Sequence, residues 1–411
     1  MSSARKTAAI LIAGIMLGGC FAGTLSSGEG TPAPASETSS QTGHGTVPSD
    51  TPTVPPSEGT RTPGAPTVTG PLSDLPVCRE TPTVELGTME LAIVAEWDGD
   101  EDVYLIRWDG SNLRQFTNNP GRDTDPVWSK DGQQLAFVID AREAPRVYIS
   151  TADGSEGRVV APDLEVTTAH VELSPTGDLV AFRNLEDLYV VNTLTGEETL
   201  LTPGTDINPS NPRFSPAGTM LVFKADAPSG NDGLFVVNVD GTGLRELKTA
   251  LEDMNGPSWH PTGDEILFEG RIPSEGVGLY VASLDGTIEK LPIVPIYGPA
   301  GAAWSPDGSM IGYIVHFSVL GSSGEIVQKN SLHVAKADEN VDVELVKPPD
   351  EPDGGLRIHE IAWAPDGRHI AYTTVSDGRT DLYVLDICNG TTSLVVQGVD
   401  FFSTPSWRPL P

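Results

Sequence analysis

Basic residues and cysteines are scarce in this sequence, and each shortage excludes a class of protein. The 411-residue chain has 25 Lys and Arg against 57 Asp and Glu, which gives a formal net charge of −32. Such a chain repels phosphate backbones and anionic lipid headgroups, so we expect neither general nucleic-acid binding nor unaided docking on a membrane. Three cysteines are too few for a zinc ribbon, an iron–sulfur site or a disulfide-dense scaffold.

Recognisable catalytic motifs are also missing. The sequence has no Gly-x-Ser-x-Gly elbow, no Gly-rich phosphate loop and no His-Glu-x-x-His site. Residues 98–102 (Asp-Gly-Asp-Glu-Asp) place carboxylates at alternate positions, like the start of a calcium loop, but the Gly and the distant Glu of such a loop are misplaced. A solvated turn is the favoured interpretation of this segment. We therefore predict no catalytic residue, no metal and no cofactor.

An apolar run near the N-terminus is typical of a signal peptide. Basic residues at 5–6 precede the run 8–16, which is too short to span a bilayer as a mature helix. Residues 17–20 (Leu-Gly-Gly-Cys) resemble the bacterial lipobox. The resemblance implies acylation of Cys20 and cleavage before it, so we expect residues 1–19 to be a lipoprotein signal peptide. An ordinary secretory signal with an incidental cysteine is the alternative.

Residues 20–77 form a predicted linker that carries the lipidated cysteine. From position 21 to 77, 37 of 57 residues are Ser, Thr, Pro or Gly. Such a segment cannot bury enough apolar surface to offset the entropy of ordering it, so we expect a disordered stalk. The stalk would hold a folded body, residues 78–411, above the outer face of the cytoplasmic membrane, or at an outer membrane if one is present.

One pattern recurs through the body. An aromatic or apolar lead residue precedes a Ser-Pro-Asp-Gly-like turn, and a strand of β-branched and aromatic residues follows. Another strand and an Asp-Gly or Asn-Gly hairpin come next. Successive lead residues are 45, 41, 45, 45, 59 and 44 residues apart. Four antiparallel strands in about 45 residues make one β-propeller blade. The lead residues are Trp128, Leu173, Phe214, Trp259, Trp304, Trp363 and Trp407.

The two ends of the body complement one another. Residues 405–407 supply one strand, whereas residues 91–94 are typical of the second strand of a blade. We predict that the C-terminal strand pairs with the N-terminal strands in a composite blade. Six whole repeats and this blade would form a closed, all-β, seven-bladed propeller without open sheet edges. A six-bladed ring is the alternative.

These repeats resemble the β-propeller repeats of the TolB family. Residues 304–308 (Trp-Ser-Pro-Asp-Gly) and 382–384 (Leu-Tyr-Val) match its consensus as they stand. The resemblance covers nearly all of 89–411 and implies the propeller fold. The chain departs from TolB in two respects. We expect a lipid anchor and a stalk where TolB has a small α/β domain, and we count seven blades where TolB has six. Related propellers occur in prolyl-oligopeptidase-type peptidases and in some pectate-fragment lyases.

The two remaining cysteines lie at opposite ends of the body. Cys78 is at the junction of stalk and body, and Cys388 precedes the Asn389-Gly390 hairpin of the sixth repeat. Because an exported chain meets oxidising conditions, we predict a Cys78–Cys388 disulfide that holds the entering chain beside the closing blade. Two free or buried thiols are the alternative.

The channel mouth is the predicted site. In a propeller the innermost strand of each blade lines the channel, and here that strand precedes each lead residue. Polar residues lie three or four positions before the lead residues, where they could form a hydrogen-bonding pocket; a water-filled channel without a ligand is the alternative. The candidate ligand-binding residues are Asp125, His170, Asn211, Asn255, His359 and Glu360, with Thr404 at the same position of the last repeat.

These features predict a monomeric, lipid-anchored extracytoplasmic propeller that binds an envelope protein, peptide or glycan without catalysis. A lyase or hydrolase is the alternative, with His170, His359, Asp125 and Glu360 as acid and base groups at the channel mouth. A structural spacer without a ligand is a third possibility. The fifth repeat is longer than the others, and we expect its excess residues, 315–330 and 346–357, to form loops that border the partner site; tolerated insertions without a role are the alternative.

Overall fold

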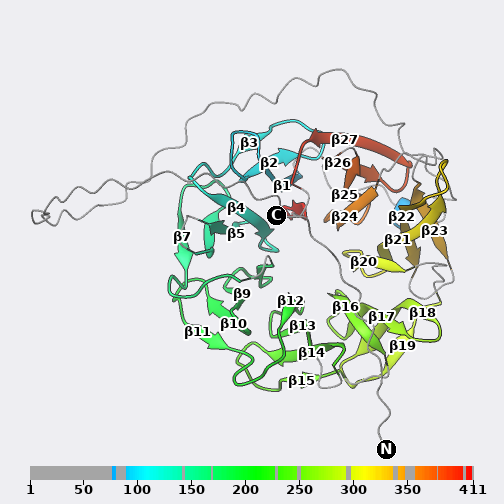
Figure 1. Cartoon of the computed structure of the whole chain (residues 1–411). Helices are drawn as coiled ribbons and strands as arrows, with labels where there is room; N and C mark the ends of the chain where they lie inside the picture. Colours follow the sequence, from blue (N-terminus) through cyan, green and yellow to red (C-terminus); the bar gives the residue numbers. More distant parts are fainter. Residues whose placement is uncertain are drawn as a thin grey trace, which may run out of the picture. The chain divides into compact units, whose positions relative to one another are not determined.

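The computed structural model describes residues 76–79, 89–140, 144–167, 170–226, 230–247, 251–292, 298–336, 341–347, 357–376, 378–400 and 404–409. The predicted signal peptide, Cys20 and nearly all of the predicted linker lie outside these residues. The described residues form seven four-stranded antiparallel sheets around a central axis (Figure 1). The prediction of an all-β, seven-bladed propeller is therefore confirmed. A single 3-10 turn, η2 (Pro76–Arg79), precedes the blades, and no helix in the described part is long and apolar enough to cross a membrane.

All seven blades follow one plan, in which the first strand lies nearest the central axis and the fourth at the rim (Figure 1). The strands are, in blade 1, β4 (Arg122–Trp128), β5 (Gln134–Asp140), β6 (Arg146–Thr151) and β7 (Gly157–Val160); in blade 2, β8 (Glu172–Leu173), β9 (Leu179–Asn184), β10 (Asp187–Asn192) and β11 (Glu198–Leu200); in blade 3, β12 (Ser210–Phe214), β13 (Met220–Asp226), β14 (Asp232–Asn238) and β15 (Arg245–Glu246); in blade 4, β16 (Glu252–Trp259), β17 (Glu265–Ile272), β18 (Gly276–Ser283) and β19 (Ile288–Lys290); in blade 5, β20 (Pro299–Trp304), β21 (Met310–Leu320), β22 (Ile326–Lys336) and β23 (Asp342–Val346); in blade 6, β24 (Arg357–Trp363), β25 (His369–Ser376), β26 (Arg379–Asp386) and β27 (Thr391–Gln397); and in the closing blade, β28 (Ser406–Trp407), β1 (Glu90–Ala95), β2 (Asp102–Arg107) and β3 (Arg114–Gln115).

The turn after each lead residue joins the first two strands of six blades. Its glycine N–H donates to the carbonyl three residues earlier, at 2.8–3.0 Å, and the glycine has a positive φ that other residues rarely adopt. In four of these turns the serine hydroxyl also accepts a backbone N–H five residues later, at 3.0–3.1 Å. The repeated Ser-Pro-Asp-Gly pattern therefore forms the predicted turn. The glycines are Gly132, Gly177, Gly218, Gly263, Gly308 and Gly367.

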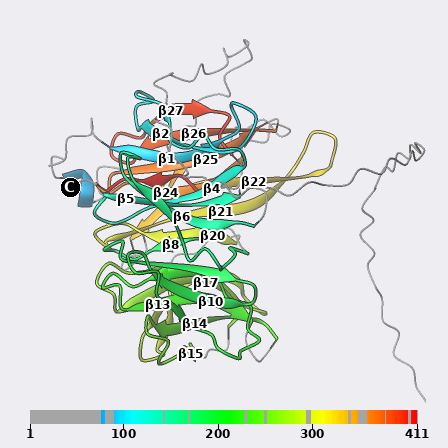
Figure 2. The same ribbon diagram turned by 90° about the vertical axis from the view of Figure 1, so that its left-hand side faces the viewer.

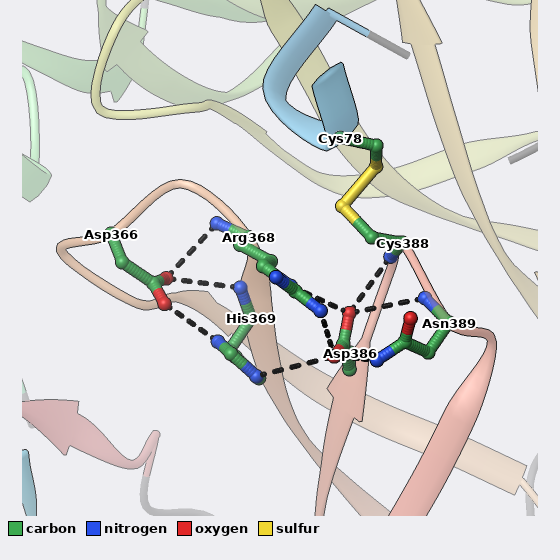
Figure 3. The surroundings of a disulfide bond; sticks show 7 residues. All are labelled: Cys78, Asp366, Arg368, His369, Asp386, Cys388 and Asn389. Carbon is green, nitrogen blue, oxygen red and sulfur yellow. Dashed lines mark hydrogen bonds and ion pairs between the residues drawn. A yellow bond between two sulfur atoms is a disulfide. The ribbon is translucent and has the colours of Figure 1, made fainter. Parts of the chain in front are cut away.

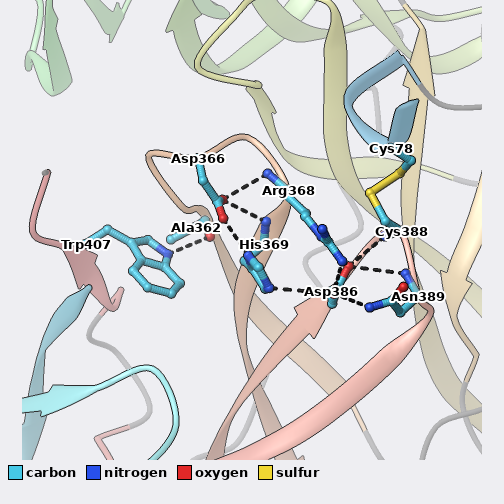
Figure 4. Close-up of polar contacts among 9 residues, drawn as sticks. All are labelled: Cys78, Ala362, Asp366, Arg368, His369, Asp386, Cys388, Asn389 and Trp407. Atoms are coloured by element: carbon cyan, nitrogen blue, oxygen red, sulfur yellow. Dashed lines mark hydrogen bonds and ion pairs between the residues drawn. A yellow bond between two sulfur atoms is a disulfide. The ribbon is translucent and has the colours of Figure 1, made fainter. Parts of the chain in front are cut away.

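The closing blade combines strands from both ends of the body, as predicted. Trp407 and Ser406 in β28 pair with Leu91 and Ala92 in β1. The Trp407 indole N–H donates to the Ala362 carbonyl of β24 at 3.0 Å, which fixes the closing blade to blade 6 (Figure 4). The ring is therefore shut by two paired residues and by side chains that reach the neighbouring blade.

Lead tryptophans pack between blades. Trp128, Trp259, Trp304 and Trp407 are only 6–8% exposed, within apolar clusters that join neighbouring sheets. The indole N–H groups of Trp259 and Trp363 donate to carbonyls of the preceding blade's first strand, at 3.0 and 3.1 Å. Each of these rings therefore sets the distance between two blades as well as filling the space between them.

The structure contains the predicted disulfide between Cys78 and Cys388, whose Cα atoms are 5.2 Å apart. Asp386, two residues before Cys388, accepts two hydrogen bonds from the Arg368 guanidinium, at 2.9 and 2.7 Å. It also accepts the backbone N–H groups of Cys388 and Asn389 (Figure 3). The half-cystine of blade 6 is therefore held on a rigid hairpin.

Residues 315–330 do not form the expected loop. β21 and β22 pair continuously from Met310↔Lys336 to Leu320↔Ile326, so most of this excess extends a two-stranded ribbon. Figure 2 shows the ribbon projecting beyond the neighbouring strands. The prediction was wrong because the segment alternates polar and apolar residues from 316 to 319, which is a strand pattern, and only residues 321–325 form the turn. Of the second predicted insertion, residues 348–356 lie outside the described residues.

Candidate functional site

The first strand of each blade, which lies nearest the propeller axis, alternates buried and exposed residues. In all seven blades the residue two before the lead residue is buried, and those one and three before it are at least partly exposed. Side chains on a strand alternate between its faces, so the two exposed positions share one face. Four of the buried positions carry proline, namely Pro126, Pro212, Pro257 and Pro405.

The position three before the lead residue is bent in four blades. Asp125, Asn211, Gly256 and Gly301 have φ values of 53°, 51°, 59° and 62°, and the pairing with the second strand shifts at each. Left-handed backbone is tolerated best by Gly, Asn and Asp. Asp125 and Asn211 are therefore suited to a β-bulge as well as to a ligand, and the polarity of these two positions alone is no evidence of binding.

A charged pair occupies the position directly before the lead residue in two adjacent blades. Glu172 of β8 and Arg213 of β12 form an ion pair at 3.0 Å, with side chains 20% and 43% exposed. Burial raises the pKa of Glu172, and the charge of Arg213 opposes the rise. The equivalent residues of the other five blades are small or apolar: Val127, Ser258, Ala303, Ala362 and Ser406. The sequence search missed this pair because it considered only positions three and four before the lead residue.

His170 lies near this pair. Burial, and then the positive charge of Arg213, lower the pKa of His170 to about 4, so the imidazole is neutral at physiological pH. His170 is nevertheless exposed to solvent. A neutral imidazole beside a guanidinium can accept a hydrogen bond on one nitrogen and donate one on the other.

A second polar group joins blade 6 to the closing blade. His359 Nδ1 lies 3.6 Å from Glu360 Oε1, and the Thr404 hydroxyl donates to Glu360 Oε2 at 3.2 Å. Burial raises the pKa of Glu360, whereas the charges of His359 and Arg213 oppose the rise.

The structure brings some of the predicted site residues together and leaves others apart. His359 and Glu360 are in contact, and His170 interacts with Arg213. Asp125 lies elsewhere: Thr124 donates to it at 3.1 Å, and burial and Asp400 raise its pKa. Within the described part of the chain, Asn211 and Asn255 make no side-chain hydrogen bond. Asn255 is exposed on β16, opposite Glu269.

Known proteins share both the repeats and the fold. A family model described as the TolB beta propeller domain matches residues 70–263. The Tol-Pal system protein TolB of Bordetella pertussis is 29% identical over 150 residues, which is 36% of this chain and 33% of that protein. The chain therefore spans about a third of the length of such curated relatives.

Two solved structures of oligogalacturonate lyases share the fold. One, in complex with manganese, gives a TM-score of 0.57 at 18% identity and covers 74% of this chain and 86% of that chain. The other, from Vibrio parahaemolyticus, gives 0.56 at 16% identity and covers 72% and 85%. At these identities the likeness concerns the fold alone. The family match identifies the repeats within residues 70–263 as TolB-type β-propeller repeats, and the seven sheets of the closed ring extend the same fold to the rest of the described body.

Proposed function

We propose that this protein binds a protein, peptide or glycan of the cell envelope at its propeller channel, without transforming it. The Glu172–Arg213 ion pair carries the proposal, because it lies where the other five blades present small or apolar residues. The pair offers a carboxylate and a guanidinium at a position that is uncharged in the other five blades. A protruding segment with a carboxylate and amide groups fits such a point, since guanidinium binds carboxylate through two parallel hydrogen bonds.

The proposal places the protein on a membrane through a lipid on Cys20, with residues 21–77 as the tether. The lipobox-like residues 17–20 support the anchor, and the composition of the tether supports an extended linker. The curated relatives are named as Tol-Pal system proteins, which supports an envelope location. Replacement of Cys20 by Ala should release the protein from the membrane fraction and abolish metabolic labelling with a palmitate analogue. A membrane-bound, labelled Cys20→Ala variant would contradict the anchor.

Site-specific crosslinking in intact cells tests the binding site. A photo-crosslinking residue at Ser258, in the channel beside Arg213, should capture a partner that the same probe at Leu194 does not. Leu194 is 74% exposed, so it reports on random encounters. Arg213→Ala should abolish the Ser258 crosslink. Lys290→Ala, which breaks the Lys290–Glu275 ion pair of 2.8 Å in blade 4, should leave it intact. Equal capture from both probe positions would contradict the channel site.

A lyase or hydrolase at the channel mouth is the alternative. His359 and Glu360, at 3.6 Å, are the described residues best placed for acid–base chemistry. A screen against envelope polymers and oligogalacturonides distinguishes the two functions. Turnover that His170→Ala or His359→Ala abolishes would favour the enzyme, whereas binding without turnover supports the proposal.

A further inference from the structure

Three carboxylates converge in the loop between β1 and β2. Oxygen atoms of Asp98, Asp100 and Asp102 all lie within 4.8 Å of one another. Asp98 is exposed, Asp100 is partly buried and Asp102 is fully buried. Among the described residues this is the one group of three acidic, histidine or cysteine side chains that approach so closely. Carboxylates so close repel one another unless a positive charge lies between them.

A fourth carboxylate, from β4 of blade 1, lies beside this group with an unsatisfied oxygen. Asp123 is 0% exposed, and its Oδ2 accepts no hydrogen bond from the described residues. Its backbone N–H donates to the Glu101 carbonyl at 2.7 Å, so the start of β4 lies against the loop 98–102. A buried carboxylate oxygen without a donor is costly, and it needs a proton or a cation.

Hydrogen bonds hold the segment that leads into β4 against the loop. The Gly121 N–H donates to Asp100 Oδ2 at 3.1 Å, and Asn119 donates to Asp123 Oδ1 at 3.1 Å. The Thr117 hydroxyl donates to Asp102 Oδ1 at 2.9 Å. Because a hydroxyl has one proton, and that proton is directed to Asp102, Thr117 cannot also satisfy Asp123 Oδ2.

Blade 2 contains the same framework without the additional carboxylates. There the Thr202 hydroxyl donates to Asp187 Oδ1 at 2.9 Å and accepts the Leu188 N–H at 3.0 Å. Thr117 likewise donates to Asp102 and accepts the Val103 N–H, each at 2.9 Å. The Asp–Thr contact is therefore a structural feature of the repeat, whereas the other three carboxylates are additions that the blade does not need.

Neutral groups alone donate to the four carboxylates within the described part of the chain. The donors are Gln115 to Asp98 and Asp102, Thr117 to Asp102, Asn119 to Asp123, and the Gly121 N–H to Asp100, all at 2.7–3.1 Å. Arg122 is adjacent in sequence, but its guanidinium is held by Glu101 at 2.7 and 3.0 Å. The four negative charges have no ion pair with Lys or Arg among the described residues.

We propose that Asp98, Asp100, Asp102 and Asp123 bind a calcium ion that joins the closing blade to blade 1. Calcium accepts six to eight oxygen ligands in flexible geometry, and alternating aspartates in a loop supply such ligands. The sequence favoured a solvated turn because the distant acidic ligand of a calcium loop was misplaced. In the proposed site Asp123, from β4, takes the place of that ligand. The site lies between two blades and is independent of the function proposed for the channel.

Calorimetric titration of the chelator-treated full chain with calcium chloride tests the site. We expect saturable binding of one ion with a Kd on the order of 1 mM or tighter, as in extracellular calcium modules, and an increase in the thermal midpoint. Asp100→Asn should weaken binding by about tenfold or more, since affinity depends on the number of charged ligands. Asp187→Asn, the matched substitution in blade 2, should leave calcium affinity unchanged.

Three results would overturn the site: no saturable heat at millimolar calcium, unchanged affinity in Asp100→Asn, or magnesium binding as tightly as calcium. Unchanged affinity in Asp100→Asn would place any bound calcium elsewhere, for example in the channel. If Asp100→Asn fails to fold without calcium, as judged by circular dichroism, Asp98→Asn decides the question. Asp98 is exposed and its replacement leaves the buried contacts of Asp102 and Asp123 in place.

Discussion

Blade 6 and the closing blade have the same sheet order, but they are stabilised by different kinds of contact. In blade 6 a four-residue turn joins the first two strands. Asp366 in that turn accepts a hydrogen bond from His369 Nδ1 at 2.6 Å. In the closing blade no turn joins β28 to β1. There the Arg408 guanidinium binds Glu90 at 3.2 Å and the Gly132 carbonyl at 3.0 Å. Contacts between distant residues thus replace a local turn.

Figure 4 shows how the two blades meet. Trp407 extends from the closing blade to Ala362 in blade 6, while the turn residues of blade 6 bind one another and Asp386. One repeat pattern can thus be stabilised by a local turn or by residues far apart in the chain. Removal of local contacts should weaken a blade, whereas removal of the distant ones should open the ring. The following predictions test that difference.

Trp407→Ala should have the largest effect. Loss of a buried indole typically costs about 3–5 kcal/mol of unfolding free energy, and here the hydrogen bond to Ala362 is lost as well. Trp304→Ala is the control. Trp304 is equally buried, but it ends β20, which a local turn joins to β21. Urea unfolding gives both losses. Only Trp407→Ala should expose residues 404–409 to carboxypeptidase, and equal digestion of both variants would remove the distinction.

Loss of the disulfide should cost about 2–4 kcal/mol, because the bond closes a long loop in the unfolded chain. The two cysteines are 310 residues apart. Cys78→Ala, Cys388→Ala and the double variant should be destabilised equally in urea unfolding under oxidising conditions. A mass shift after reduction and alkylation of the wild type checks that the bond forms. A double variant as stable as the wild type would show that the bond does not stabilise the ring.

Arg408→Ala should lower the unfolding free energy by about 2 kcal/mol, the usual range for hydrogen bonds to charged groups. The variant loses the ion pair with Glu90, the bond to Gly132 and the contact with the Trp128 ring, 5.0 Å from the guanidinium. Arg122→Ala is the control, since Arg122 is 63% exposed in its ion pair and should cost less than about 1 kcal/mol. Thermal unfolding at low salt compares the two, and a larger loss for Arg122→Ala would contradict the importance of Arg408.

Asp386 should make the unfolding free energy depend slightly on pH in the acidic range. Burial alone would raise the pKa of Asp386, but Arg368 and the backbone N–H groups of Cys388 and Asn389 lower it below its usual value of 3.8. A lowered pKa in the folded state stabilises the protein above the unfolded pKa, and this stability is lost as the pH falls through the folded value. Asp386→Asn should therefore lose about 1 kcal/mol at pH 6 and less at pH 3. Unfolding free energies that change with pH as in the wild type would contradict this.

Much of the fold follows from the sequence because each blade repeats its turn chemistry. Ser-Pro-Asp-Gly turns and lead tryptophans give the number of blades, and the half-blades at 91–94 and 405–407 give the closure. The disulfide between Cys78 and Cys388 could be predicted because an exported chain meets oxidising conditions. These features depend on short-range patterns that recur, so they can be read without coordinates.

The candidate site was harder to predict because the first strands of several blades contain a β-bulge, which interrupts the regular alternation of their side chains. Asp125 and Asn211 were chosen for their polarity, although their left-handed backbone alone favours Asp or Asn. Glu172 and Arg213 lie at a register position that the search did not consider. Asp123 lies near the loop 98–102 only in the fold, so no spacing within one loop could reveal it.

The disulfide also determines how tension on the N-terminal side of the propeller would travel. Cys78 is bonded to Cys388 in the hairpin after β26, and the chain reaches β1 only at Glu90. A pulling force applied before Cys78 would pass through the sulfur bridge into blade 6, whose hairpin is braced by Asp386 and Arg368. Residues 90–95 would carry little of that load. The two paired residues that shut the ring are thereby shielded from mechanical peeling.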